Sequence, residues 1–306
     1  MKKILVLKIG IEFKISTESI MNISVIIPAT GECEYLLEAI NSALLQNYPA
    51  EFEIIVVIQS VPSEIVARLS ELNYKNILTV YDPGNTIVSA LNLGLKNAKY
   101  DWIARLDSDD LMASGRIEKQ TNFLQNNSEY LLVGGQAQVI DVYGKQIKVA
   151  RYPINDYAIK FGLSVQSTLP HPGVLIKKKI LQDLGGYTLN FPNIEDFDLW
   201  RRVSKLGKLY NLRSVVVHYR THSGQVTIRR NQEIIFTKSK FILLGLNRNK
   251  NFTNLEISEF AKFLNLIEEK NWKRVISLTT YHKQRKYFIE FLFRKLIFKL
   301  LKICGQ

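Results

Sequence analysis

The sequence is poor in cysteine. Its 306 residues include only Cys33 and Cys304, which lie near opposite ends of the chain. Two thiols placed so far apart provide neither a disulfide framework nor the ligand spacing of a zinc site. Their scarcity favours a protein that resides in the reducing cytoplasm.

Long hydrophobic runs are also missing, although the hydrophobic fraction of 46% is that of a globular chain rather than a disordered one. Lys8 and Glu12 interrupt the apolar stretch at residues 1–13, and no small-residue cleavage site follows it. We therefore predict neither a transmembrane span nor a signal peptide. A regular pattern begins only at Asn22, so residues 1–21 are expected to form an N-terminal extension, either an added strand or the product of an upstream start codon.

Acidic residues are outnumbered by basic ones, 28 against 41, and they are scarcest at the C-terminus. Residues 272–306 contain a single acid, Glu290, among nine lysines and arginines. Such a tail predicts a polyanionic neighbour, either anionic lipid or a phosphorylated substrate. Nucleic acid is not predicted as a partner, because no nucleic-acid-binding motif accompanies the charge.

The last part of this tail, residues 287–303, has the pattern of an amphipathic helix. Its polar positions are assigned to one helical face: Glu290, Arg294, Lys295, Lys299 and Lys302. Two interpretations are open. The helix could lie in a membrane interface, which would make the protein peripheral on the inner face of the cell membrane, or it could pack on the domain with its lysines solvated.

Short apolar runs alternate with helical patterns in the first half of the chain. Strands are predicted at residues 22–28, 52–58, 77–81 and 102–106, and helices at residues 35–45, 62–72 and 87–97. Pro28 is expected to stop the first strand. This alternation predicts an α/β fold with a mostly parallel, Rossmann-like sheet and flanking helices, in which the loops after the strands meet along one edge.

The second half of the chain is less regular. Its pattern predicts a helix over 111–126, a hairpin within 130–152, a strand at 174–176, helices at 179–184 and 196–206, and strands near 208–210 and 215–219. From Asn231 onward only helical patterns remain, so a C-terminal helical extension is expected.

Three carboxylates, Asp107, Asp109 and Asp110, follow the predicted strand at 102–106. Charges this close repel one another unless a cation or several hydrogen-bond donors lie among them. A divalent cation carrying a diphosphate is one interpretation, because carboxylate oxygens suit Mg²⁺ and Mn²⁺. The alternative is that Asp109 or Asp110 caps the helix predicted from residue 111.

Seven segments, in this order, resemble family 2 glycosyltransferases, the inverting nucleotide-sugar enzymes with a GT-A fold. They are Ile-Ile-Pro at 26–28, Ala-Leu-Asn-Leu-Gly at 90–94, Arg-Leu-Asp-Ser-Asp-Asp at 105–110, His-Pro at 171–172, Leu-Gly-Gly-Tyr at 184–187, Glu-Asp-Phe-Asp-Leu-Trp at 195–200 and Tyr-Arg-Thr-His at 219–222. The resemblance covers about residues 22–227.

The resemblance implies roles for the charged residues. Asp109 would bind Mg²⁺ or Mn²⁺, Asp107 would lie on the nucleotide and metal side, and His222 would be a further metal ligand, unless it is an ordinary surface histidine. Asp196 would be the catalytic base that accepts the acceptor proton, with Glu195 as the alternative. The competing interpretation of both is that they are carboxylates favoured at a helix N-terminus.

The nucleotide-sugar site implied by the resemblance comprises Pro28, Ala29, Thr30, Gln59, Asn92, Arg105, Asp107 and Ser108. His171 and Trp200 could line the acceptor pocket, or each could be a buried structural residue. Gly185 and Gly186 suggest either a turn that approaches the sugar or a helix C-cap. The sequence departs from the family where an acidic pair is replaced at Gln59 and an aromatic residue at Thr30, so a UDP-linked donor is not specified.

The leading hypothesis is a metal-dependent inverting glycosyltransferase that acts on a lipid-linked precursor of a surface polysaccharide or lipopolysaccharide. The alternatives are a non-catalytic, membrane-associated subunit of glycan assembly and a nucleotidyltransferase. We expect a glycosyltransferase domain at 22–228, with a nucleotide-binding half at 22–112 and an acceptor half at 113–228, followed by a helical region at 229–306.

Overall fold

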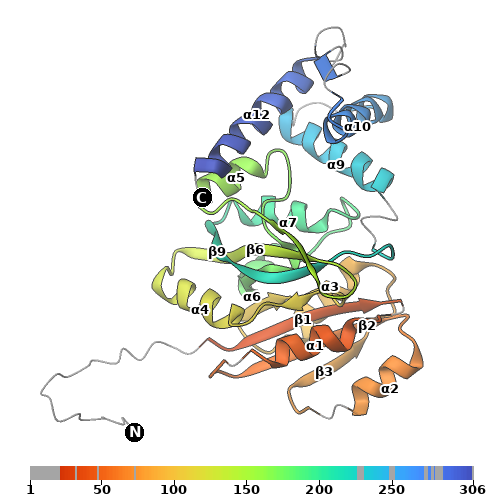
Figure 1. The fold of residues 1–306 in the computed structure, drawn as a ribbon, viewed down its shortest axis with the longest axis vertical. Coiled ribbons are helices and arrows are strands. Elements are labelled where there is room, and N and C mark those ends of the chain that lie inside the picture. Colours follow the sequence, from red (N-terminus) through yellow and green to blue (C-terminus); the bar gives the residue numbers. More distant parts are fainter. Residues whose placement is uncertain are drawn as a thin grey trace, which may run out of the picture.

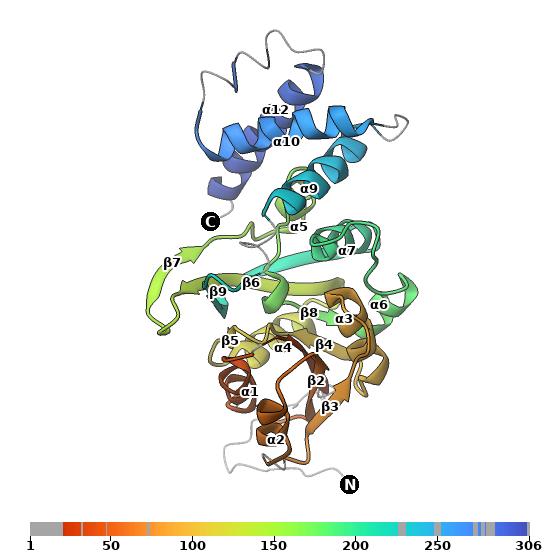
Figure 2. The same cartoon turned by 90° about the vertical axis from the view of Figure 1, so that its right-hand side faces the viewer.

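The computed structural model describes residues 21–31, 33–46, 48–71, 74–225, 231–247, 252–271, 275–276, 279 and 285–304. The predicted extension at 1–21 lies outside these ranges except for Met21. The described chain forms a sheet with helices on both faces, and a group of helices from the C-terminal region lies beyond one face (Figures 1 and 2).

The parallel half of the sheet is confirmed. Its strands are β1 (Ile23–Thr30), β2 (Phe52–Gln59), β3 (Ile77–Tyr81) and β4 (Trp102–Arg105), and its helices are α1 (Leu36–Leu44), α2 (Ser63–Glu71) and α3 (Ile87–Asn97). All neighbouring pairs in the order β3-β2-β1-β4 are parallel. The ends of these strands therefore lie along one edge, as the alternating pattern predicted.

Pro28 does not end β1, which continues to Thr30 beside β2. The prediction of a stop was wrong because β4 pairs only with Ile23–Ile26, so Pro28 lies beyond the reach of that neighbour. Its missing N–H therefore breaks no ladder on the β4 side.

The second half completes the same sheet. Among the described residues nine strands join in the order β3-β2-β1-β4-β8-β6-β9-β5, with β7 paired to β6. The added strands are β5 (Leu111–Met112), β6 (Tyr130–Ile140), β7 (Gln146–Ala150), β8 (Leu175–Lys177) and β9 (Lys208–Arg220). The two strands predicted near 208–210 and 215–219 are one strand, interrupted by a shift of register against β6.

The helix predicted from residue 111 begins later. Leu111 and Met112 form β5, and α4 spans Arg116–Asn126 after Gly115, which has φ of +65° at the N-cap. The prediction that Asp109 or Asp110 caps this helix is therefore wrong. The pairing of β5 with β9 outweighs the helical pattern of residues 111–115.

Alternate residues of the central strands feed two cores on the two faces of the sheet. Ile26 and Val57 face the core formed with α3, whereas Val25 and Val56 face the core formed with α1 and α4. The first core also includes residues of α5 (Asp156–Gly162), α6 (Lys178–Asp183), α7 (Glu195–Val203), α9 (Asn231–Leu246), α10 (Asn254–Glu268) and α12 (Arg285–Cys304).

The apolar residues of α12 form two stripes along the helix, one buried and one exposed. Phe288, Phe291 and Phe298 are at most 4% exposed, and the Phe298 ring occupies the space beside Gly162 of α5. The packed alternative is thus confirmed for this stripe. Ile289 and Phe293, by contrast, are 51% and 62% exposed. Across the described residues, no helix is both long and apolar enough to span a bilayer.

Candidate active site

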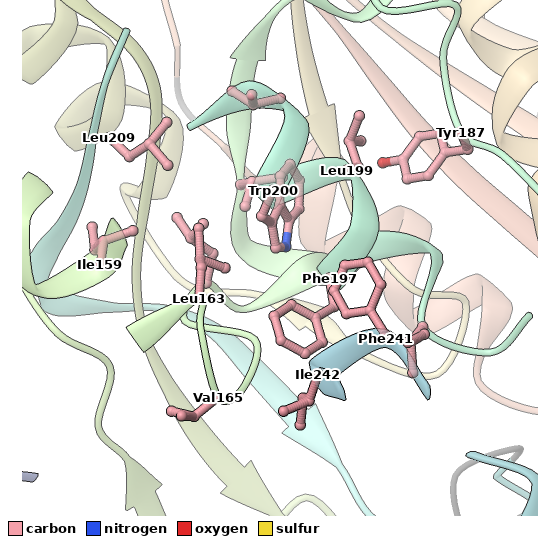
Figure 3. Packing of buried hydrophobic residues seen from close by; sticks show 14 of the residues in the cluster. Ile159, Leu163, Val165, Tyr187, Phe197, Leu199, Trp200, Leu209, Phe241 and Ile242 are labelled. Carbon is pink, nitrogen blue, oxygen red and sulfur yellow. The ribbon is translucent and has the colours of Figure 1, made fainter. Parts of the chain in front are cut away.

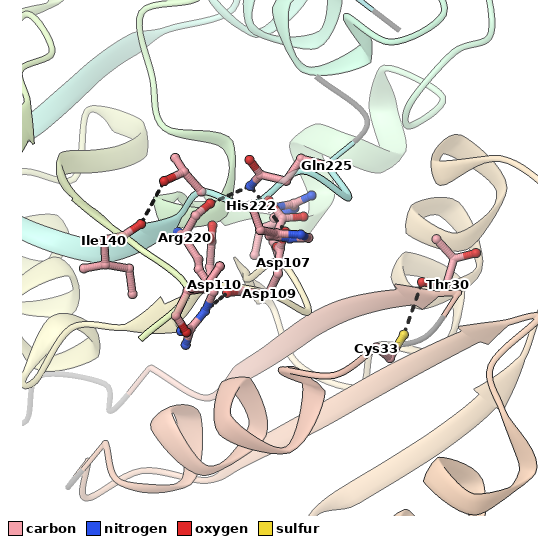
Figure 4. A network of polar contacts seen from close by, with 12 residues as sticks. Thr30, Cys33, Asp107, Asp109, Asp110, Ile140, Arg220, His222 and Gln225 are labelled. Atoms are coloured by element: carbon pink, nitrogen blue, oxygen red, sulfur yellow. Dashed lines mark hydrogen bonds and ion pairs between the residues drawn. The ribbon is translucent and has the colours of Figure 1, made fainter. Parts of the chain in front are cut away.

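The three predicted carboxylates lie in the connection between β4 and β5. β4 pairs with β1, and β5 pairs with β9 at the opposite end of the strand order. The chain therefore crosses here from the parallel strands to the far edge of the sheet. Carboxylate oxygens of Asp107, Asp109 and Asp110 all lie within 4.8 Å of one another. Asp110 is fully buried, and the other two are half-buried (Figure 4).

Arg220, at the end of β9, holds this connection in place. Its backbone N–H donates to Asp110 Oδ1 (2.8 Å), and its Nε donates to the carbonyl oxygen of Asp109 (2.9 Å). Its Nη2 reaches Glu38 Oε2 of α1 (2.7 Å), and the guanidinium lies 4.1 Å from the centre of the Tyr35 ring. Arg220 belongs to a matched motif, yet its role was missed because its partners are distant in sequence.

His222 lies beside the same cluster. Its Nε2 is 3.0 Å from Asp109 Oδ2, and Gln225 Nε2 donates to that oxygen across 3.4 Å (Figure 4). The structure thus brings together two predicted metal ligands that are 113 residues apart. Gln225 carried no sequence signal.

The acidic cluster suits a divalent cation. Burial and the negative charges of Asp107 and Asp109 raise the pKa of Asp110 well above its ordinary value, and burial also raises the pKa of Asp107. Asp110 Oδ2 is buried and has no hydrogen-bond partner among the described residues. A cation bound at this cluster would relieve the repulsion with the oxygen ligands that Mg²⁺ and Mn²⁺ prefer.

Arg105 connects the acidic cluster to a second group of carboxylates. It is 4% exposed and forms an ion pair with Asp107. Its positive charge also acts to lower the pKa values of Glu195 and Asp196, against the larger effect of burial. Arg105 therefore lies between the end of β4 and the start of α7, where it can act on groups from both halves.

Asp196 and Glu195 occupy the first turn of α7. Asp196 Oδ2 accepts a hydrogen bond from Ser167 Oγ at 3.1 Å, and burial raises the pKa of Asp196. Burial, and then the charge of Asp196, raise the pKa of Glu195 to about 7. Glu195 Oε2 is buried and has no partner among the described residues. Both carboxylates therefore have features of groups that exchange protons.

Asp198, in the same turn, has a different environment. It binds Arg202 Nε at 2.9 Å and Thr188 Oγ1 at 3.1 Å. Asp198 is thus held by side chains, whereas Asp196 also accepts a hydrogen bond from the backbone N–H of Phe197, as a carboxylate at a helix N-terminus does.

The two residues proposed for the acceptor pocket are packed together. His171 Nε2 is 3.0 Å from the Tyr187 hydroxyl, and burial lowers the pKa of His171 well below its ordinary value. Trp200 is 0% exposed and lies in the core against His171 (Figure 3). The sugar-stacking interpretation of Trp200 is wrong because the ring is covered, and the core interpretation is confirmed.

The predicted nucleotide-sugar residues differ in how accessible they are. Thr30 is exposed at the end of β1 and Ser108 is half-buried in the β4–β5 connection, whereas Pro28 and Ala29 lie within the buried strand. Gln59 is 5% exposed, and its amide donates to Asp82 Oδ2 (2.6 Å) and to neighbouring carbonyls. Its donor capacity is therefore already used within the protein.

The side chain of Asn92 is hydrogen-bonded to the backbone of Tyr187. Its Nδ2 donates to the Tyr187 carbonyl and its Oδ1 accepts from the Tyr187 N–H, both at 2.9 Å. Gly185 and Gly186, at φ of +72° and +73°, end α6 with N–H bonds to Gln182 and Leu181. These are the bonds of a Schellman cap, so the C-cap interpretation is confirmed.

Comparison with known proteins identifies related sequences. A family model described as glycosyl transferase family 2 matches residues 24–185. The O-antigen biosynthesis glycosyltransferase WbnJ of Escherichia coli is 33% identical over 211 residues, which are 66% of this chain and 80% of WbnJ. The amylovoran biosynthesis glycosyltransferase AmsE of Erwinia amylovora is 29% identical over 158 residues, which are 51% of this chain and 59% of AmsE.

An uncharacterized glycosyltransferase of Rickettsia felis is 29% identical over 66% of this chain, but only 35% of its own length is matched. The chain thus spans about a third of the length of some curated relatives. Among solved structures, S. aureus TarS 1–349 in complex with UDP-GlcNAc has a TM-score of 0.57 at 18% identity, covering 89% of this chain and 80% of that one. At this sequence identity, the likeness shows a shared fold and nothing more specific.

Proposed function

Because the chain belongs to glycosyltransferase family 2 and has a GT-A fold, we propose that it is a metal-dependent inverting glycosyltransferase. It moves a sugar from a nucleotide-diphosphate donor to a hydroxyl group of a growing surface glycan. The observation that carries this proposal is that Arg105 forms an ion pair with Asp107 of the acidic cluster and also acts electrostatically on Asp196.

Each side of this arrangement has its own task. Asp107, Asp109 and His222 would hold Mg²⁺ or Mn²⁺, which would neutralise the departing diphosphate. Asp196 takes the proton of the acceptor hydroxyl. At the same time the hydroxyl oxygen forms a bond to the anomeric carbon of the donor sugar, and the bond between that carbon and the diphosphate breaks. Ser167 fixes the orientation of the Asp196 carboxylate. Arg105 supplies positive charge near both groups.

The proposal is tested by screening nucleotide sugars for Mn²⁺-dependent donor hydrolysis, which also identifies the donor. Asp109→Asn should abolish this hydrolysis while the circular dichroism spectrum stays unchanged. The matched control is Asp101→Asn, because Asp101 is an exposed acid just before β4. Normal turnover by Asp109→Asn would contradict the metal assignment, and absence of hydrolysis with every donor would favour the non-catalytic alternative.

We further propose that the acceptor is lipid-linked and that α12 brings the enzyme to the cytoplasmic face of the membrane. The supporting observation is its second stripe, in which Ile289, Phe293 and Leu296 are 51%, 62% and 57% exposed. Their spacing places them on one helical face, and exposed Lys286 and Lys299 add positive charge for anionic lipid.

Sedimentation with vesicles that contain phosphatidylglycerol tests this membrane proposal. Phe293→Glu with Leu296→Glu should at least halve the bound fraction, because both charges would enter the apolar layer. Leu189→Glu is the control, since Leu189 is 60% exposed and lies outside α12. Equal sedimentation of all three proteins would refute the assignment of this stripe.

A further inference from the structure

A polar cavity lies between the segment 151–154 and the middle of β9. Its volume is about 240 Å³, and its lining consists of Gln136, Arg151, Ile154 and Arg213. Arg151 and Arg213 are both exposed residues. None of these described lining residues is acidic.

The positions of the two arginines follow from the fold. Gly134 pairs with Asn211 and Gln136 pairs with Val215, so residues 212–214 bulge out of β9 and carry Arg213 with them. Bulges of this kind redirect side chains beside functional sites. Buried Gln136 fixes both sides of the cavity, because its Oε1 accepts from the Tyr152 N–H (2.7 Å) and its Nε2 donates to the Leu212 carbonyl (2.8 Å). Arg151 and Arg213 are the neighbours of these two anchored residues.

The same segment is linked to the proposed base. Asn211 Nδ2 donates to the carbonyls of Pro153 (2.7 Å) and Thr168 (2.9 Å). Ser167, next to Thr168, donates to Asp196. Two sets of hydrogen bonds, joined by the peptide bond between Ser167 and Thr168, therefore connect the backbone beside the cavity to Asp196.

From this arrangement we infer that Arg151 and Arg213 bind an anionic group of the acceptor, a phosphate or a sugar carboxylate, while the acceptor hydroxyl lies at Asp196. Two guanidinium groups at one cavity give it a positive charge that suits such an oxyanion, and guanidinium groups are well shaped to bind phosphate and carboxylate oxygens. This inference deepens the proposed function and rests on it, because it specifies the acceptor as an acidic one.

Binding can be tested without turnover. Isothermal titration with inorganic phosphate and, separately, with D-glucuronate is carried out in EDTA, so that no metal ion recruits the anion to the acidic cluster. The wild-type chain should bind at least one of the two anions at one site. Arg151→Gln with Arg213→Gln should weaken that binding at least tenfold. The matched control is Arg68→Gln with Lys75→Gln, which removes the same charge at exposed positions in α2 and in the segment before β3.

The two arms distinguish the sources of the anion. Preference for phosphate indicates the phosphate of a lipid-linked acceptor, and preference for glucuronate indicates an acidic sugar. If neither anion binds the wild-type chain, or if the arginine variant and the control bind equally, the inference is wrong. Once a donor is identified, the arginine variant should have a higher KM for an acidic acceptor than the wild-type chain. Its rate of donor hydrolysis without acceptor should be unchanged. If the wild-type chain hydrolyses none of the nucleotide sugars, that result would instead oppose the proposed function.

Discussion

Asp196→Asn is expected to separate the effect of this residue on catalysis from its effect on stability. Asparagine keeps the size of the side chain and an oxygen that can accept the Ser167 hydrogen bond, which is worth about 1 kcal/mol. It cannot accept a proton at neutral pH. A general base contributes roughly 10²- to 10⁴-fold, so kcat should fall by that factor, which corresponds to about 3–5 kcal/mol of activation free energy.

The effect on stability should have the opposite sign. Burial raises the pKa of Asp196 in the folded protein, so its ionised form destabilises the fold. The stability associated with such a raised pKa is present below the unfolded pKa and is lost as pH rises through the folded pKa. Asparagine carries no charge at neutral pH, so the midpoint of thermal unfolding should stay equal or rise.

Asp198→Asn is the matched control, because Asp198 lies two residues further along in the same turn of α7. It weakens the ion pair with Arg202, so it should lower the free energy of unfolding by about 1–2 kcal/mol and leave kcat within a few-fold of wild type. Donor turnover with a saturating acceptor and differential scanning calorimetry measure the two effects. If Asp196→Asn keeps more than a tenth of kcat, Asp196 is not the base, and Glu195→Gln becomes the decisive variant.

Three further changes test other parts of the structure. Because the pKa of Glu195 is raised to about 7, wild-type stability should decline from pH 5 to 7.5, and Glu195→Gln should flatten that decline in thermal melts. Trp200→Ala should lower the free energy of unfolding by about 3–5 kcal/mol in urea titrations, because the ring is fully buried. Gly186→Ala should destabilise by more than about 1 kcal/mol, since φ is +73° and its Cβ would overlap Asn92 Oδ1; an unchanged urea midpoint would contradict the Schellman cap.

The parallel half of the fold could be predicted because its signals are local. Buried parallel strands read as apolar runs, and helix α3 was placed residue for residue at Ile87–Asn97. The start of α4 could not be predicted, because residues 111–115 fit a helix locally. Leu111 and Met112 form β5 only through pairing with β9, which lies about 100 residues away. Tertiary pairing overrides local preference there.

The same distinction applies to the candidate site. Asp107, Asp109 and Asp196 stand in matched motifs, so their types and order identified them. Arg220 could not be assigned from sequence, because its partners come from α1, the β4–β5 connection and the loop before β7. Gln59 is a different case, because the resemblance places it in the nucleotide-sugar site whereas its amide N–H groups are bound to Asp82 and nearby carbonyls, which the sequence did not indicate.

The raised pKa values around this site have a common consequence. Asp107, Asp110, Glu195 and Asp196 are all held where burial disfavours their charged forms, so each ionised group costs folding free energy in the absence of ligands. A ligand that neutralises them binds the folded state alone and must stabilise it. At a hundredfold excess over its dissociation constant, a cation at the acidic cluster would add about 2.7 kcal/mol. Thermal stabilisation by Mn²⁺ should therefore be lost in Asp109→Asn even where no donor is known, because the repulsion that the cation relieves is a property of the folded chain itself.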